Sequence, residues 1–119
     1  MIVNSTQPDQ YSWVIGFSGK LNFQSRHVFQ NAMAQAEQTS PCQIILDLTD
    51  LSHIDSAGLG LLTLTHRKLS AKGTRMVIAK AQSTVRDLLL LTNMDKMFSL
   101  YDSVAAASQT SKTAMIPHK

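Results

Sequence analysis

The chain has 119 residues, of which 44% are hydrophobic and 16% are charged, and this length and composition fit one domain with a core of its own. No stretch approaches the roughly 18 continuous apolar residues of a membrane span, and the first residues lack the charged start of a signal peptide, so we expect a cytoplasmic protein that binds no membrane. The net charge of +3 arises without a run of basic residues, which argues against nucleic-acid binding, and the lone Cys42 excludes an internal disulfide.

Two strands and a helix are predicted at the start of the chain. Residues 1–6 form an edge strand, residues 7–10 form a turn, and the apolar run over 11–18 forms the next strand, which pairs antiparallel with the first. Asn22 is suited to cap a helix over residues 23–38. The apolar face of this helix recurs at helical spacing, with Phe29, Ala32, Met33 and Ala36.

The middle of the chain alternates strand, helix and strand. An almost uninterrupted apolar run over residues 42–46 ends at Asp47 and is typical of a strand buried on both faces. The leucines at 59, 62 and 69 then follow a helical period, Leu61 and Leu64 widen the apolar stripe, and Gly73 closes the helix. With a strand over 74–79, this order implies a right-handed parallel crossover.

The last elements complete a small α/β domain. A helix over residues 84–92, capped by Ser83, is apolar on nearly all sides, and a short strand over 97–101 and an alanine-rich helix to about residue 108 follow. We therefore predict a domain over residues 1–108, with a mixed sheet of four or five strands and about four helices mostly on one face. Residues 109–119 are polar and aperiodic and are predicted to be a tail.

The turn between the buried strand and its helix carries the most informative residues. Ser56 is placed as the helix N-cap, where its hydroxyl accepts from the amide of Gly58 or Leu59. A helix N-terminus also favours an anion, so a phosphate on this serine would be accommodated. Gly58 and Gly60 each cost about 1 kcal/mol of helix propensity relative to alanine. They either let another protein approach the hydroxyl or serve only close helix packing, with Ser56 only a cap.

These residues resemble the signature of the bacterial anti-sigma factor antagonists, the single-domain STAS proteins. The resemblance is carried by Asp55-Ser56-Ala57-Gly58-Leu59-Gly60, preceded by Leu51-Ser52-His53-Ile54 and by the strand end Leu46-Asp47-Leu48. In that family the serine after the aspartate is phosphorylated by a partner kinase, and that position here is Ser56. The order of elements agrees from about residue 2 to residue 107, so the resemblance implies a STAS-like fold.

The resemblance implies a regulator that is not an enzyme and has no cofactor. The unphosphorylated form would bind an anti-sigma factor that is typically a serine kinase, and so release a sigma factor or another target, for example in a stress, motility or biofilm programme. Phosphorylation of Ser56 would end the binding, and a serine phosphatase would restore it. The implied partner-binding residues are Asn22, His53, Asp55, Ser56, Ala57, Gly58, Leu59 and Gly60. Where the family usually has Gly-Glu-Leu-Asp, residues 19–22 read Gly-Lys-Leu-Asn, which removes negative charge beside this surface.

The same residues also allow other functions. A constitutive STAS interaction subunit of a lipid transporter or a stress-sensing assembly would use Ser56 only as a helix cap. A dinucleotide loop lacks its third glycine, a serine-hydrolase elbow would need glycine in place of Ile54, and the histidines are too dispersed for a metal site. Asp47 reads as a strand-end residue that binds loop amides, and Asp50 as a turn residue.

Overall fold

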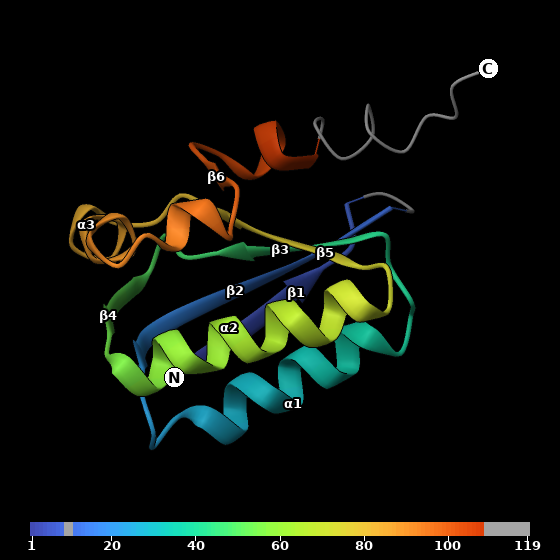
Figure 1. Ribbon diagram of the computed structural model, residues 1–119. Helices are drawn as coiled ribbons and strands as arrows, with labels where there is room; N and C mark the ends of the chain where they lie inside the picture. Colours follow the sequence, from blue (N-terminus) through green and yellow to red (C-terminus); the bar gives the residue numbers. More distant parts are fainter. Residues whose placement is uncertain (9–10, 109–119) are drawn as a thin grey trace.

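A mixed sheet runs through the middle of the molecule (Figure 1). The computed structural model describes residues 1–8 and 11–108, so the tail predicted at 109–119 lies outside the described residues. Within the described part the sheet has six strands. Five lie in the order β1 (Ile2–Thr6), β2 (Ser12–Leu21), β3 (Gln43–Asp47), β5 (Arg75–Ala79) and β6 (Leu100–Tyr101), and β4 (Leu51–Ile54) pairs with β2 off this path.

The strand directions agree with the sequence prediction. β1 is antiparallel to β2, whereas β2 with β3, β3 with β5, and β5 with β6 are all parallel. The predicted α/β class and the parallel crossover from β3 to β5 are therefore confirmed. The sheet has one strand more than the four or five expected, because residues 51–54 form β4 and extend the sheet beside the far end of β2.

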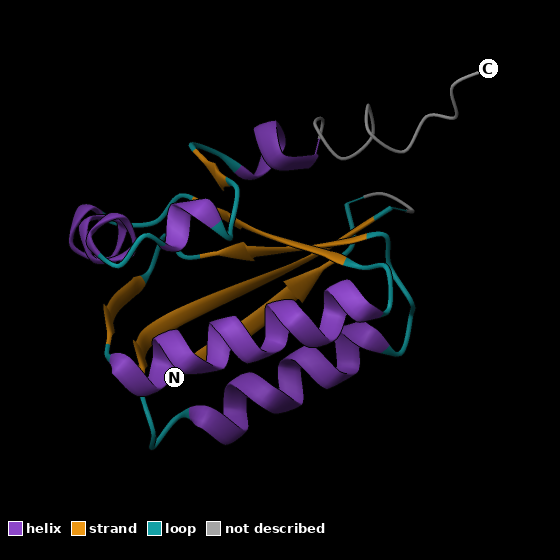
Figure 2. Ribbon diagram, viewed as in Figure 1, coloured by secondary structure: helices purple, strands orange, loops and turns teal. Residues whose placement is uncertain are grey.

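Helices cover the sheet unequally (Figure 2). α1 (Arg26–Glu37) and α2 (Ser56–Ala71) lie side by side on one face. α3 (Ser83–Leu91) lies near β4, and the 3-10 turn η1 (Met94–Lys96) follows it. A last helical stretch over residues 104–108 packs Ala107 against the opposite face of the sheet.

The core explains why β3 is an unbroken apolar run. Ile44 and Leu46 face α1 and α2 in the larger core cluster, while Ile45, between them, faces Ala107 on the other side of the sheet. Both faces of β3 are therefore covered, as expected for a central parallel strand. The larger cluster also contains side chains from β2, β5, α1 and α2, among them Ile15, Phe17, Phe29, Met33, Leu62, Leu69, Met76 and Ile78.

Several predicted boundaries are wrong. β2 continues to Leu21, and α1 begins at Arg26 instead of residue 23, because residues 22–25 form a hydrogen-bonded turn. β6 is only Leu100–Tyr101, since η1 takes up residues 94–96. The third helix begins at Ser83 after an N-cap at Gln82 that makes no side-chain cap hydrogen bond, so Ser83 is not its cap.

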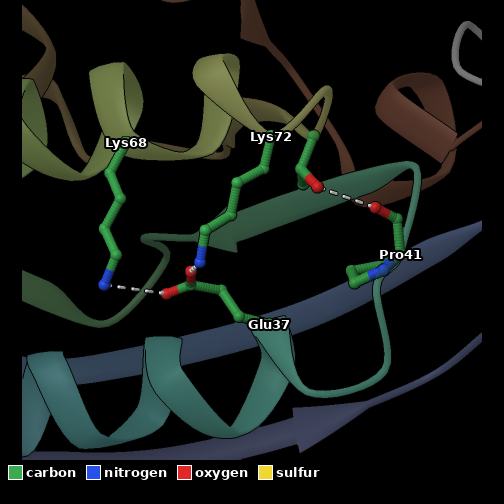
Figure 3. Close-up of polar contacts among 5 residues, drawn as sticks. Glu37, Pro41, Lys68 and Lys72 are labelled. Atoms are coloured by element: carbon green, nitrogen blue, oxygen red, sulfur yellow. Dashed lines mark hydrogen bonds and ion pairs between the residues drawn. The ribbon is translucent and has the colours of Figure 1, made fainter.

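The C-terminal ends of α1 and α2 are joined by charged side chains (Figure 3). The Glu37 carboxylate, on a side chain only 12% exposed, lies 2.9 Å from Lys72 Nζ and 3.8 Å from Lys68 Nζ. Close by, the Thr74 hydroxyl donates to the Pro41 carbonyl at 3.0 Å. Both lysine side chains are more than half exposed, so these ion pairs align the helices more than they stabilise the fold, at about 0–1 kcal/mol each.

The two faces of α2 give a matched stability test. Leu62 is fully buried, whereas Leu64, which the sequence placed on the apolar stripe, is 65% exposed. We expect Leu62→Ala to lower the free energy of unfolding by about 2–5 kcal/mol, because it leaves a cavity, and Leu64→Ala to change it by less than about 0.5 kcal/mol. Urea unfolding followed by circular dichroism measures both, and equal losses would contradict this orientation of α2.

Candidate functional site

The parallel strands bring the predicted site residues to one edge of the sheet. β2, β3, β4 and β5 run in the same direction, so their carboxyl ends and following loops meet at the left of Figure 1. α2 begins at this edge, directly after β4. In open α/β sheets the carboxyl edge is where ligands most often bind, so the position alone makes it the first region to inspect.

Asp55, and not Ser56, is the N-cap of α2. Asp55 has extended backbone angles, and its Oδ1 accepts a hydrogen bond from the Gly58 amide at 2.9 Å. The prediction of Ser56 as the cap is therefore wrong. Aspartate and serine are about equally good caps. The register is set by β4, because the Asp55 amide donates to the Leu21 carbonyl at 3.4 Å and keeps this residue outside the helix.

Ser56 is thereby left with a free hydroxyl. It is the first residue of α2 and is exposed, and within residues 1–8 and 11–108 its side chain has no hydrogen-bond partner. The amides of the first helical turn have no intrahelical acceptor, and the positive end of the helix dipole lies there. A group added to this hydroxyl would meet water and a favourable potential for negative charge.

The two glycines of the first turn differ in what surrounds them. A Cβ on Gly58 would overlap the Leu21 carbonyl oxygen and lie 2.8 Å from Ile54 Cγ1, so this glycine is needed for α2 to pack on the ends of β2 and β4. A Cβ on Gly60 would meet nothing within 4 Å. Gly60 therefore has no packing role within the described residues, and its exposed backbone is open to another molecule.

The other predicted partner-binding residues lie around Ser56. Ala57 and Leu59 are half-buried, and Leu59 packs against the core. His53 is on β4; it is exposed and pairs in register with Lys20 of β2. Asn22 lies in the turn that follows β2, two residues after Lys20. The structure thus brings all the predicted residues to one edge, and their role in binding remains a prediction.

Phe23 belongs to the same edge and was missed by the sequence reading. Its side chain is 58% exposed, and the Arg26 guanidinium lies 3.6 Å from the ring centroid. The sequence placed Phe23 at the start of a helix, directly after the predicted partner-binding residue Asn22, and assigned it no role in the site. Its position between Asn22 and Ser25, outside the apolar stripe of α1, was the available signal.

Of the carboxylates at the β3–β4 connection, Asp47 has a structural role. Asp47 accepts hydrogen bonds from the Thr49 amide at 3.1 Å and the Thr49 hydroxyl at 2.6 Å, as its reading as a loop-binding strand end predicted. Among the described residues there is no group of three or more His, Cys, Asp or Glu side chains that could hold a metal ion. None of the helices that the structure describes combines the length and apolarity needed to cross a bilayer.

Comparison with known proteins assigns the family. The sequence model of the protein family described as the STAS domain matches residues 3–107. The chain belongs to the STAS family. The anti-sigma F factor antagonist of Paenibacillus polymyxa is 28% identical over 91 residues, which are 76% of this chain and 78% of that protein. The resemblance stated from the serine motif is therefore confirmed at the level of the family.

Solved STAS structures share the fold. An anti-sigma factor antagonist from Mycobacterium paratuberculosis superposes with a TM-score of 0.83 at 25% identity, over 93% of each chain. The anti-sigma factor antagonist SpoIIAA in its unphosphorylated form gives a TM-score of 0.71 at 19% identity, over 98% of this chain and all of that one. The phosphorylated form of SpoIIAA from Bacillus gives 0.69 at 20% identity, over 92% and 99%. The STAS fold predicted for this chain is thus confirmed.

Separate alanine substitutions of the cap and of its neighbour distinguish their roles. We expect Asp55→Ala to lower the free energy of unfolding by about 1 kcal/mol, because the Gly58 amide loses its acceptor. Ser56→Ala should change it by less than about 0.5 kcal/mol, because no hydrogen bond is lost. Denaturant unfolding compares the two variants, and a larger loss for Ser56→Ala would restore the serine as the cap.

Replacing each glycine with alanine should change the free energy of unfolding in opposite directions. Gly58→Ala forces backbone or Ile54 to move and should cost about 1–3 kcal/mol of unfolding free energy. Gly60→Ala fills open space on a helix and should gain up to about 1 kcal/mol. Thermal and urea unfolding of both variants test this, and destabilisation by Gly60→Ala would reveal a packing role for that glycine.

Proposed function

We propose that this STAS domain is an anti-sigma factor antagonist that changes partners under the control of Ser56. The unphosphorylated domain binds an anti-sigma factor with serine kinase activity, and the target of that factor is released. Transfer of a phosphate to Ser56 ends the binding, and a serine phosphatase reverses the modification. The released target is a sigma factor or a component of a stress, motility or biofilm programme.

The observation that carries this proposal is the free hydroxyl of Ser56. A serine that served only as a cap would hold its oxygen against the first amides of α2, but Asp55 occupies that position. The hydroxyl is exposed at the carboxyl edge of the sheet, within reach of a kinase. Beside it, Gly60 leaves the surface of the first turns of α2 open. A constitutive subunit with Ser56 as a helix cap accounts for neither feature.

A phosphate at Ser56 would alter the surface and leave the fold intact. Phosphoserine adds about −1.5 to −2 charge and three acceptor oxygens. At the start of α2 the helix dipole and unpaired amides favour that charge. The core side chains nearest in sequence, Ile54 and Leu62, point into the domain and are not disturbed. Binding would be lost through bulk and repulsion at the interface, without a rearrangement of the domain.

The relatives support the same reading. The Paenibacillus relative is named for antagonism of an anti-sigma F factor. SpoIIAA, which shares the fold, has been solved both without and with phosphate. Those descriptions concern other proteins, and their transfer to this chain is the content of the proposal.

Substitution of Ser56 tests the switch. We expect Ser56→Asp to remain folded and to lose the partner that the wild-type domain retains, because its carboxylate places charge where the phosphate would lie. Ser56→Ala should retain the partner under all growth conditions. Ser70→Asp is the matched control, since it adds the same charge at an exposed position near the other end of α2. Affinity capture from the native cells, followed by circular dichroism of each variant, gives both readouts.

The modification itself can be measured directly. Intact mass and phosphopeptide mapping of the protein from its own cells should find phosphate on Ser56 in a fraction that changes with growth condition. Absence of phosphate in every condition, together with partner retention by Ser56→Asp, would instead favour a constitutive interaction subunit. An unfolded Ser56→Asp protein would contradict the claim that the switch leaves the fold intact.

A further inference from the structure

We propose that the partner of this domain presents an acidic patch with an apolar pocket, and that Phe23, stacked on Arg26 in the turn that begins at Lys20, docks into it. This inference rests on the proposed function and adds the chemistry of the partner to it. Lys20, Phe23 and Arg26 are called the Phe23 surface below. Two of these residues are cations and the third is an exposed aromatic ring.

Phe23 is placed unlike every other phenylalanine of the chain. Phe17, Phe29 and Phe98 are at most 2% exposed and belong to the core, whereas Phe23 is 58% exposed. A solvent-exposed ring keeps apolar surface in contact with water, which is unfavourable in the isolated domain. Burial of such a ring in a partner recovers that cost, which is why aromatic residues dominate the energetic centres of interfaces.

The turn that carries Phe23 is held rigid before any partner arrives. The Asn22 and Ser25 amides exchange hydrogen bonds with each other's side chains, each at 3.0 Å, and the Ser25 hydroxyl donates to the Lys20 carbonyl at 2.8 Å. Ser25 is itself buried. Little conformational entropy is then lost when the ring docks, so the contact yields more binding free energy than a mobile loop would give.

Arg26 completes the anchor. Its guanidinium lies 3.6 Å from the Phe23 ring centroid, and its Nη1 donates to the Phe23 carbonyl at 2.7 Å. The stack fixes the ring and the cation as one unit. Because guanidinium groups bind carboxylates through two parallel hydrogen bonds, an aspartate or glutamate at the edge of the partner's pocket would match this unit.

The Phe23 surface adjoins Ser56. Lys20 pairs in register with His53 and Leu21 with Ile54, and the Asp55 amide donates to the Leu21 carbonyl. The start of α2 is therefore hydrogen-bonded to the end of β2. The turn that carries Phe23 follows β2 directly. We therefore expect a protein bound over the Ser56 hydroxyl to extend to the Phe23 surface.

The sign of charge follows from the same side chains. Neither Lys20 nor Arg26 forms an ion pair within the described residues, so both can pair with a partner. The same edge also carries carboxylates: Asp47 and Asp55 accept hydrogen bonds from their own turns, and Asp50 is exposed in the β3–β4 turn. The positive charge offered to the partner is therefore confined to the turn that carries Phe23, and the acidic patch is matched to that turn alone. An acidic partner also explains why phosphate would end binding, since it adds negative charge to a face that must meet carboxylates.

The test uses the protein that Ser56→Ala retains from native cells, identified by mass spectrometry and then purified. Its dissociation constant is measured by calorimetry against Phe23→Ala and Lys20→Glu in the Ser56→Ala background. We expect each to weaken binding at least about tenfold, as for central interface residues, whereas Phe23→Leu, which stays apolar and adds no polar group to the pocket, should retain more of the binding than Phe23→Ala. Arg67→Glu and Leu91→Ala are the matched controls, because they make the same kinds of change at exposed positions away from this turn, and should bind within about twofold of the parent.

The outcomes separate the two proposals. Binding that Ser56→Asp abolishes but Phe23→Ala and Lys20→Glu leave unchanged would overturn the Phe23 surface and keep the switch. Tighter binding by Lys20→Glu would overturn the acidic patch. Co-sedimentation with phosphatidylglycerol vesicles that depends on Phe23, with no effect on the protein partner, would assign the surface to membranes and refute the inference. Failure of Ser56→Ala to retain any protein, with no phosphate on Ser56, would contradict the proposed function first.

Discussion

The pairing of β4 with the end of β2 is the constraint on which the whole site depends. β2 changes partner along its length, from β3 in its first half to β4 from Gly19 on, and a bulge between Gly19 and Lys20 shifts the register within the β2–β4 pairing. Gly19 has φ of +98°, a conformation that glycine adopts without strain. This change carries the chain beyond the main sheet. It also determines where β4 stops, and hence which residue caps α2 and which one keeps its hydroxyl free.

Local patterns predicted most of the fold but not this pairing. The apolar run of β3, the helical spacing of α2 and Gly73 at its end, which has φ of +81°, each arise from interactions within a few residues. β4 could not be predicted in the same way, because Leu51-Ser52-His53-Ile54 is too short and mixed to read as a strand. It forms one only because the end of β2, some thirty residues earlier, offers unpaired backbone groups.

The features of the candidate site fall into the same two groups, those that local patterns predict and those that depend on tertiary contacts. Ser56 was predicted from the order of strand, turn and helix, and the resemblance in its motif identified the family. The assignment of the cap failed because Asp55 and Ser56 have similar local preferences, and the difference between Gly58 and Gly60 was hidden because both are glycines in one helical turn. Only the tertiary neighbours of Gly58, the Leu21 carbonyl and the Ile54 side chain, tell them apart. Phe23 was hidden for a related reason, since side-chain bonds between Asn22 and Ser25 delay the start of α1.

The separation of the cap from the free hydroxyl has a practical consequence for labelling. Because Asp55 alone holds the first turn of α2, the side chain at position 56 can be replaced by a chemically reactive one without loosening the helix. A cysteine there would be exposed, whereas the native Cys42 is half-buried just before β3. A neutral label on that cysteine adds bulk where the proposed switch adds a phosphate, so the labelled domain keeps its fold and separates the effect of bulk on association from the effect of charge.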